Sequence, residues 1–334
     1  MSSILSIPLE HIELSDETFS VNFMPDLGRL RSSIKEIGLI QPALLRGKGE
    51  RYQIVSGFRR IQVVRELGIP AIEARVFQES EADDFRLFSI TLHENLTGRG
   101  LNAVEIAYVL ERLVHRFRVD PGVVIQTFLP LLSLETNEKI LNTYLSLARM
   151  EEEIKRYVVQ EKVSRSNIRR FSSFPSEDRM AILALVSRLK LGENSLRETL
   201  TLLEEISRRE QRGVRDIVER PEIRTVLSHQ ELTSSQRTER VKKGLMALRY
   251  PRMSRLEELF DVNRKGLNLP SGLAVLHPPY FEGKGLKVEL RFETLQEYRS
   301  LVNSLSGLPE KEAFQDLLAG TMQPEGSRKT NNRG

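Results

Sequence analysis

The hydrophobic pattern of the chain changes near residue 102, and this change limits the folds that the sequence can adopt. Before it, a stretch of alternating apolar and polar residues, Ala71–Phe77, follows segments with apolar residues at helical spacing, such as Asp26–Ile37. Alternation is typical of half-buried strands, and the longer period is typical of amphipathic helices. The first hundred residues are therefore predicted to form one α+β domain.

After residue 102 the period is helical, and near the C-terminus strand patterns return. Gly272–Leu276 and Leu286–Phe292 are predicted strands, followed by a helix over Leu295–Leu305. The predicted fold class is α+β, with a mixed N-terminal domain, a central all-helical bundle and a small C-terminal β-loop-β-α unit. The expected division is a mixed domain at 1–101, a helical bundle at 102–210, a basic helical linker at 211–270, the small unit at 271–320 and a disordered tail at 321–334.

The composition excludes several classes of site. The 334-residue chain has no Cys, which rules out disulfides, zinc–thiolate sites, iron–sulfur clusters and thiol nucleophiles. Absence of Cys also fits a reducing compartment. The N-terminal residues MSSILSIPLEHIEL do not resemble a signal peptide, and no apolar run reaches the ~18 residues of a membrane span. We therefore expect a cytoplasmic protein with no membrane partner.

Positive charge is concentrated in residues 207–255, here called the basic segment. The whole chain has a formal charge of +4, but this segment alone has thirteen Lys/Arg against six Asp/Glu, a local charge of +7. Such a segment can follow a phosphate backbone. A solvated helix face explains the same pattern equally well.

A strand–turn–helix signal at residues 52–68 is the best candidate for a ligand site. Gly57 follows a predicted strand and opens a predicted helix, and Arg59 and Arg60 lie in the first helical turn. Helix N-termini bind anions, and guanidinium groups suit polyphosphate oxygens. The alternative is that both arginines pair with internal acids such as Glu94 or Asp84.

A second segment, residues 93–107, has residue types that suit Mg²⁺ and phosphate. Glu94 and Asn95 are predicted to end a helix, and a carboxylate beside an amide oxygen suits Mg²⁺, which takes few protein ligands. Arg99 could reach a phosphate, and Asn102 is a predicted N-cap of the next helix.

Together these pieces resemble a known family. GLIQPALLR (38–46), SGFRRIQVV (56–64) and HENLTGRGLN (93–102) are similar to the three nucleotide-binding boxes of the ParB chromosome/plasmid partition family. In that family the third box leads into a helix-turn-helix bundle. The resemblance covers roughly residues 1–175 and implies a ParB/sulfiredoxin-like domain that binds CTP and Mg²⁺.

The resemblance also implies roles for individual residues. Gln41 and Pro42 would lie near the base and ribose, and Glu94 and Asn95 would serve Mg²⁺ and phosphate, with Arg99 as a further phosphate contact. The residues implied around the triphosphate are Ser56, Gly57, Phe58, Arg59 and Arg60. In the family, CTP closes a dimeric clamp over double-stranded DNA. A homodimer, nucleoid association and a partition ATPase as partner are therefore expected by analogy.

Two departures from the family pattern modify this expectation. Phe58 occupies the position of an acidic residue, and phenylalanine can neither orient water nor bind Mg²⁺, so weak or no CTP hydrolysis is expected. After Glu94-Asn95 the family usually continues with Gln-Arg at the positions of Thr97-Gly98, so Arg99 is displaced by one residue.

The DNA-reading part also departs from the usual pattern. Thr136–Met150 takes the place of the recognition helix, yet it has one Lys before Arg149, and phosphate contacts usually need more cations. The candidate DNA-binding residues are Thr136, Asn137, Lys139 and Asn142, with Arg165, Arg169 and Arg170 as phosphate contacts.

Two other functions remain open from the sequence. One is a small-molecule kinase on the same fold, with Glu94 or a neighbouring carboxylate as base. The other is a nucleotide-independent adaptor whose basic segment binds nucleic acid. The sulfiredoxin branch of the fold needs a catalytic Cys, which this chain lacks.

Overall fold

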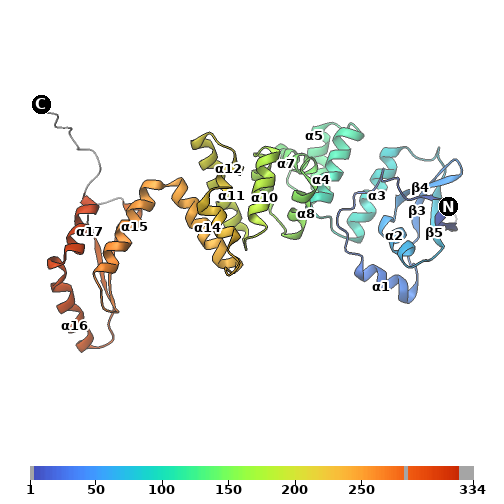
Figure 1. The fold of residues 1–334 in the computed structure, drawn as a ribbon. Coiled ribbons are helices and arrows are strands. Elements are labelled where there is room, and N and C mark those ends of the chain that lie inside the picture. The colour runs from blue at the N-terminus through green and yellow to red at the C-terminus, as the bar shows by residue number, and fades with distance from the viewer. Residues whose placement is uncertain (1–3, 282–284, 323–334) are drawn as a thin grey trace, which may run out of the picture. The chain divides into compact units, whose positions relative to one another are not determined.

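The computed structural model describes residues 4–281 and 285–322, and the chain divides into two compact units, Met1–Leu200 and Thr201–Gly334. The boundary between them falls inside one helix, α11 (Glu193–Glu210). Figure 1 labels the elements of each unit. The finer division into five segments stays a prediction.

The first unit begins with a five-stranded sheet in the order β1-β5-β3-β4-β2. Its strands are β1 (Ile4–Pro8), β2 (Ile12–Glu13), β3 (Ala43–Lys48), β4 (Arg51–Ser56) and β5 (Ala71–Phe77). β3 and β4 form an antiparallel hairpin, while β5 pairs parallel with β3 and antiparallel with β1. β1 is an edge strand of the sheet.

Three helices accompany this sheet, namely α1 (Gly28–Ile37), α2 (Phe58–Glu66) and α3 (Asp84–Gly98). Figure 1 shows α2 and α3 beside the strands. The apolar stripes of α1 and α2 and the alternating residues of the strands close one core, in which Leu45, Ile54 and Ile61 are almost fully buried. Gly38 ends α1 with a φ of 78°, the left-handed conformation that favours glycine. The predicted α+β class is confirmed.

Residues 102–200, all of them described, contain helices and no strand. The helices are α4 (Ala103–Glu111), η2 (Arg112–Arg116), α5 (Pro121–Val123), η3 (Val124–Phe128), α6 (Leu129–Leu131), α7 (Glu138–Ala148), α8 (Glu152–Gln160), α9 (Arg165–Ser172) and α10 (Ser176–Val186). Side-chain caps begin several of them: Asn102 before α4, Asn137 before α7 and Ser164 before α9. The helical prediction for this part is confirmed.

The second unit combines helices with a two-stranded sheet. Its elements are α12 (Val214–Val218), α13 (Pro221–Ser228), α14 (Ser234–Arg249), α15 (Pro251–Gly266), β6 (Leu273–Leu276), η4 (Pro279–Phe281), β7 (Lys287–Leu290), α16 (Leu295–Ser306), η5 (Leu308–Glu310) and α17 (Glu312–Met322). β6 and β7 pair antiparallel, as the strand prediction requires. A separate core includes Phe260, Val275 and Leu317.

Sequence reasoning missed α17 and placed a disordered tail from residue 321. α17 reaches Met322, and its Leu317 is buried in the core of the second unit. The remainder of the expected tail, 323–334, lies outside the described residues. Among the described residues, no helix combines the length and apolar character needed to cross a membrane.

Candidate functional site: a cavity between α2 and α3

Gly57 joins β4 to α2 in a conformation that only glycine adopts easily. It is the N-cap of α2, with a φ of 99° and a ψ of 17°. A Cβ on Gly57 would lie 3.1 Å from the Cβ of Ala43 and 3.2 Å from Nε of Arg60. The glycine is therefore required by the turn and by its packing on β3. Its close approach to a phosphate is a separate proposal.

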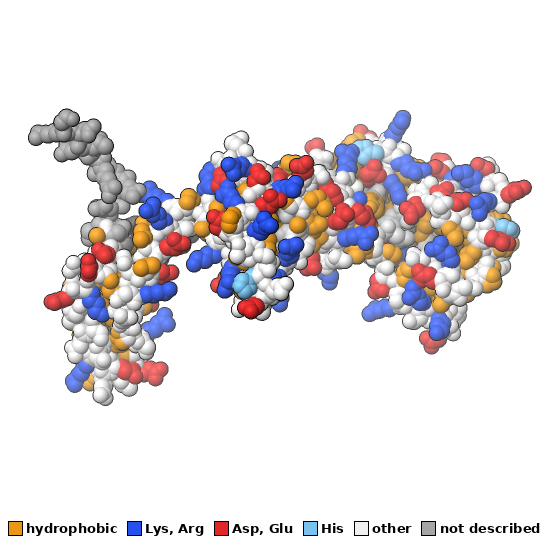
Figure 2. All heavy atoms as spheres, viewed as in Figure 1, with side chains coloured by type: hydrophobic (Ala, Val, Ile, Leu, Met, Phe, Trp, Pro, Cys, Tyr) orange, Lys and Arg blue, Asp and Glu red, His pale blue; other side chains and the backbone are white. Residues whose placement is uncertain are grey.

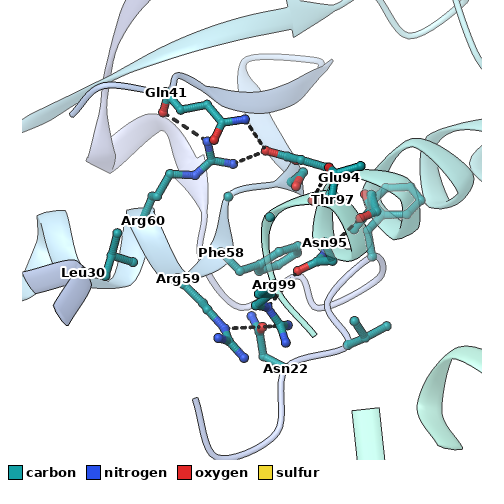
Figure 3. Close-up of a pocket in the computed structure, with 16 residues that line it drawn as sticks. Asn22, Leu30, Gln41, Phe58, Arg59, Arg60, Glu94, Asn95, Thr97 and Arg99 are labelled. Atoms are coloured by element: carbon teal, nitrogen blue, oxygen red, sulfur yellow. Dashed lines mark hydrogen bonds and ion pairs between the residues drawn. The ribbon is translucent and has the colours of Figure 1, made fainter. Parts of the chain in front are cut away.

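Arg60 connects three parts of the site. Its Nη1 donates to the backbone carbonyls of Gln41 and Pro42, each at 3.1 Å, and its Nη2 donates to Oε1 of Glu94 at 2.5 Å. Nε2 of Gln41 donates to the same carboxylate oxygen at 3.2 Å. Figure 3 shows Arg60 between Gln41 and Glu94. The side chain is only 12% exposed, so the fold fixes its position.

Arg59 points to a different carboxylate. Its Nη2 donates to Oε1 of Glu105 at 2.8 Å, and its Nε donates to Oδ1 of Asn22 at 3.0 Å. Arg99 donates to both oxygens of Glu105, at 2.6 and 3.0 Å, and to Oδ1 of Asn22 at 3.1 Å. Burial lowers the pKa of the Arg59 guanidinium, and the neighbouring charge of Arg99 lowers it further. Figure 3 shows both guanidinium groups meeting at Asn22.

The alternative expectation, that Arg59 and Arg60 pair with internal acids such as Glu94 or Asp84, is partly confirmed. Glu94 is an acid partner of Arg60, as that alternative held. Asp84 is not a partner of either arginine, because it pairs with Arg46 at 2.8 Å. The main partner of Arg59 and Arg99 is Glu105, which sequence reasoning missed. Its signal was present in the spacing Asn102-x-x-Glu105, a helix-start pattern whose carboxylate folds back on the chain.

An open cavity of about 300 Å³ lies among these side chains. It brings together most of the predicted nucleotide residues: Gln41, Ser56, Gly57, Phe58, Arg59, Arg60, Glu94, Asn95 and Arg99. Phe58 forms part of its wall, and Figure 3 shows the ring beside Asn95 and Arg99. Both arginines are thus paired with acids, but space for a ligand remains beside them.

A second cavity of about 580 Å³ adjoins the first and shares Gln41, Glu94 and Thr97 with it. Pro42 lines this second cavity, together with the apolar Leu44 and Ile90 and the cationic Arg75 and Arg86. Gln41 and Glu94 therefore lie on the border between the two spaces.

The end of α3 differs from the prediction. Glu94 and Asn95 were expected to end a helix, yet α3 continues to Gly98. Oδ1 of Asn95 accepts from Nε of Arg99 at 3.1 Å, one turn farther on. Oε2 of Glu94 is buried and has no hydrogen-bond partner in the part of the chain that the structure describes. Glu94 thus offers an unused acceptor, whereas the Asn95 oxygen is already occupied.

Comparison with known proteins shows what this part of the chain resembles. Residues 2–96 match the family model of the ParB N-terminal domain. These residues thus form a divergent ParB N-terminal domain. A chromosome-partitioning protein ParB from Myxococcus xanthus is 33% identical over 119 residues, which cover 35% of this chain and 39% of the relative. A nucleoid occlusion protein from Halalkalibacterium halodurans is 27% identical over 148 residues, which cover 44% and 49%.

The chain spans less than two thirds of the length of the curated relatives that it matches. A solved structure with similarity is the C-terminally truncated ParB of Caulobacter crescentus complexed with CTP-gamma-S. It is 22% identical, covers 55% of this chain and 97% of its own, and gives a TM-score of 0.26.

The predicted DNA-binding residues lie directly before α7, on α7 and on α9, and these two helices pack together. Thr136, Lys139 and Asn142 are exposed, whereas Asn137 caps α7 by accepting from the amide of Lys139 at 2.8 Å. The other predicted residues, Arg165, Arg169 and Arg170, lie on α9. Nη2 of Arg165 is 3.4 Å from Oε1 of Glu135. Thr143 on α7 is buried, and its hydroxyl donates to the Lys139 carbonyl, so it cannot face DNA.

Proposed function

We propose that this chain is a CTP-responsive, DNA-binding ParB-like protein that acts as a homodimeric clamp or scaffold. The observation that carries the proposal is the cavity at the start of α2, where three arginines from two neighbouring helical regions surround the glycine turn. Residues from all three sequence boxes line this one space. The nucleotide-binding role rests on that convergence together with the match to the ParB N-terminal domain.

The start of α2 favours a polyanion. The first N–H groups of a helix have no partner within the helix, and the dipole there is positive. The first turn of α2 has no acidic residue to complement that dipole, and instead carries Arg59 and Arg60. Adding Arg99 gives three guanidinium groups at one cavity, a donor set that matches the several oxygens of a triphosphate.

The two adjoining cavities suggest how the rest of the nucleotide would bind. Ligand pockets commonly measure about 300–1,000 Å³ and combine apolar walls with a few polar groups. With the triphosphate in the first cavity, the base and ribose would extend past Gln41 into the second, where Pro42, Leu44 and Ile90 provide apolar surface. This assigns Gln41 and Pro42 to the base and ribose.

A Mg²⁺ ion would be held mainly by Glu94. Among the described residues no group of three or more His, Asp or Glu side chains is gathered to hold a metal, so phosphate and water would complete the coordination. The unpaired buried Oε2 of Glu94 fits that role, and Asn95 could join only by releasing Arg99. When bound, the ion would neutralise phosphate charge. Phe58 supplies no carboxylate to orient water, so binding with weak or no hydrolysis is proposed.

The exposed face of α7 is the proposed reader of double-stranded DNA. Thr136, Lys139 and Asn142 could reach base edges in the major groove, and Arg169 and Arg170 on α9 could contact phosphates. CTP would favour the closed dimer by binding it better than the open one. The curated relatives are named for chromosome partition and nucleoid occlusion. Nucleoid association and a partition ATPase partner are proposed on that basis.

Two measurements test the proposal. Titration calorimetry should show that the chain binds CTP with Mg²⁺ more tightly than ATP, GTP or UTP. A cysteine-scanned variant set, made practical because the chain has no Cys, should give dimer crosslinks that increase when CTP and cognate DNA are added together. Equal affinity for all four nucleotides, or crosslinking that ignores CTP, would contradict the proposal.

A nucleic-acid adaptor that ignores nucleotide is the second candidate, because the basic segment has a local charge of +7. Its binding would be sequence-independent and would weaken steeply as salt is raised. Filter binding to a random duplex across a salt series, with and without CTP, distinguishes the two candidates.

A further inference from the structure

Glu105 on α4 is a buried carboxylate at the centre of the arginine cluster. Its side chain is 1% exposed and accepts hydrogen bonds from Arg59 and from both Nη atoms of Arg99. A backbone amide, that of Phe23, also donates to it, at 3.3 Å. A buried carboxylate requires such partners, because an unpaired charge in the interior is strongly destabilising.

The Glu105 carboxylate also stabilises the first turn of α4. Its Oε2 accepts from the Asn102 amide at 3.1 Å, while Oδ1 of Asn102 accepts from the amides of Val104 and Glu105, each at 3.0 Å. This reciprocal arrangement is a capping box, which satisfies backbone donors at a helix start. Glu105 is thus shared between the helix start and the two arginines that line the cavity.

Hydrogen bonds at Glu105 and Asn102 also join α4 to the loop that lines the cavity. Phe23 bonds Glu105 through its amide and Asn102 through its carbonyl, and its ring meets that of Tyr108 edge-on at 6.0 Å. Arg112 donates to the carbonyls of Ser20 and Glu17 in the same loop. Because Val21 and Asn22 of this loop line the cavity, a change at Glu105 reaches the cavity wall and α4 together.

A triphosphate and Glu105 require the same donors. Nε, Nη1 and Nη2 of Arg99 are all engaged, with Asn95, Glu105 and Asn22 among their acceptors, so phosphate oxygens could bind Arg99 only by displacing one of these. Nε and Nη2 of Arg59 are likewise committed to Asn22 and Glu105. The phosphate charge would compete most directly with the other anion in the cluster, Glu105.

We propose that Glu105 is a positioning residue that competes with the nucleotide triphosphate for Arg59 and Arg99, so that nucleotide binding loosens the first turn of α4. This inference rests on the proposed nucleotide function. The opposite arrangement is that Glu105 stays paired and holds both arginines in the orientation that phosphate needs. The two arrangements predict opposite changes in affinity when the charge of Glu105 is removed.

Glu105→Gln is the discriminating variant, because glutamine also serves at this position of a capping box and keeps the side-chain volume. Competition predicts that Glu105→Gln binds CTP about tenfold more tightly in titration calorimetry, the change expected when a hydrogen bond to a charged group no longer competes. Glu66→Gln is the matched control, since Glu66 pairs with Arg31 and lines neither cavity. Its affinity should equal that of the wild type.

Hydrogen–deuterium exchange of the wild-type chain provides a measurement that does not depend on the variant folding. With CTP bound, the amides of residues 103–106 should exchange several-fold faster, and tripolyphosphate alone should have the same effect. Unchanged or slower exchange there while CTP binds would overturn the inference, as would unchanged or weaker CTP binding by Glu105→Gln. Failure of the wild type to bind CTP would instead refute the proposed function, and this inference with it.

Discussion

The cations of the first unit's cavity and those of the basic segment differ in how the fold holds them. Arg59, Arg60 and Arg99 are 12–21% exposed, and each makes hydrogen bonds to several fixed acceptors. In the basic segment, Arg208 and Arg215 are 74% and 72% exposed and pair with glutamates one helical turn away. Figure 2 shows Lys/Arg and Asp/Glu side chains intermixed on the visible surface.

This difference teaches that local charge alone is a poor indicator of a ligand site. The basic segment has the larger charge excess, and several of its cations are neutralised: Arg220 pairs with Glu210, and Arg249 pairs with Glu205 at 2.7 Å. The cavity arginines are paired with acids as well, so neutralisation does not distinguish the two regions. The cavity has fewer cations, yet their positions are fixed before any ligand arrives. Preorganised donors lose less entropy on binding than mobile ones do.

Arg60→Ala should weaken CTP binding by about a hundredfold, or roughly 3 kcal/mol, because it removes a preorganised guanidinium. It also releases the carbonyls of Gln41 and Pro42. Calorimetry measures the affinity. Arg65→Ala on the exposed end of the same helix is the control and should bind CTP as the wild type does. Equal losses in both variants would mean that helix charge, and not fixed position, determines binding.

Gly57→Ala should destabilise the first unit by about 1–3 kcal/mol, because alanine is strained at positive φ and its Cβ would crowd Ala43. Urea unfolding followed by circular dichroism gives the shift in midpoint. Gly98→Ala, at another glycine of the cavity lining, meets no atom within 4 Å and should leave the midpoint nearly unchanged. A stable Gly57→Ala protein would show that the turn tolerates a side chain.

The ion pair between Arg179 and Glu151 tests whether a largely buried arginine that lies outside the cavities affects stability without affecting ligand binding. Its side chains are 16% and 21% exposed, much like the cavity arginines, but neither lines the two cavities described above. Hydrogen bonds from Arg179 lower the pKa of Glu151 from 4.5 to about 2. Because the pKa is lowered by folding, the stabilisation is complete above pH 4.5 and is lost as the pH falls towards 2.

Glu151→Gln should therefore reduce stability near pH 7 by roughly 2 kcal/mol and flatten its pH dependence between 4.5 and 2. Unfolding midpoints across that pH range measure this effect. CTP affinity should be unchanged, so a variant that is as stable as the wild type, or that loses CTP binding, would contradict the assignment of this pair to structure alone.

The smallest effect is expected in the basic segment. Replacing Arg240 and Lys243, both exposed on α14, by Gln should weaken binding to random duplex DNA only several-fold at moderate salt. If both contact phosphate, the slope of log affinity against log salt should fall by about 2. Arg249→Gln, whose charge Glu205 already neutralises, is the control and should change the slope less. An unchanged slope in the double variant would make the segment a solvated helix face.

Local patterns predicted much of the fold because they act over a few residues. The helix start at Gly57, the alternation in β5 and the cap at Asn102 all appear in the structure as predicted. α3 was predicted to end at Glu94 and Asn95, but it continues to Gly98. α17 was not predicted, because the sequence alone does not show that Phe314 and Leu317 pack into the core of the second unit.

The candidate site was predictable residue by residue but not as a network. The sequence boxes place Arg59, Arg60, Glu94 and Arg99 near one another, and the cavity confirms that they converge. Nothing in local spacing shows that Glu105 lies opposite Arg59, since that contact joins residues 46 positions apart. Contacts of this kind depend on how α4 packs against the loop at Phe23, which only the folded chain reveals.

The bonds from Arg60 to the carbonyls of Gln41 and Pro42 have an evolutionary consequence. In the proposed nucleotide complex, one side chain would anchor the loop near the base and also lie beside the phosphates, so base preference and binding affinity could not change independently through this position. A descendant adapted to another nucleobase would keep Arg60 and acquire its new preference at neighbouring positions.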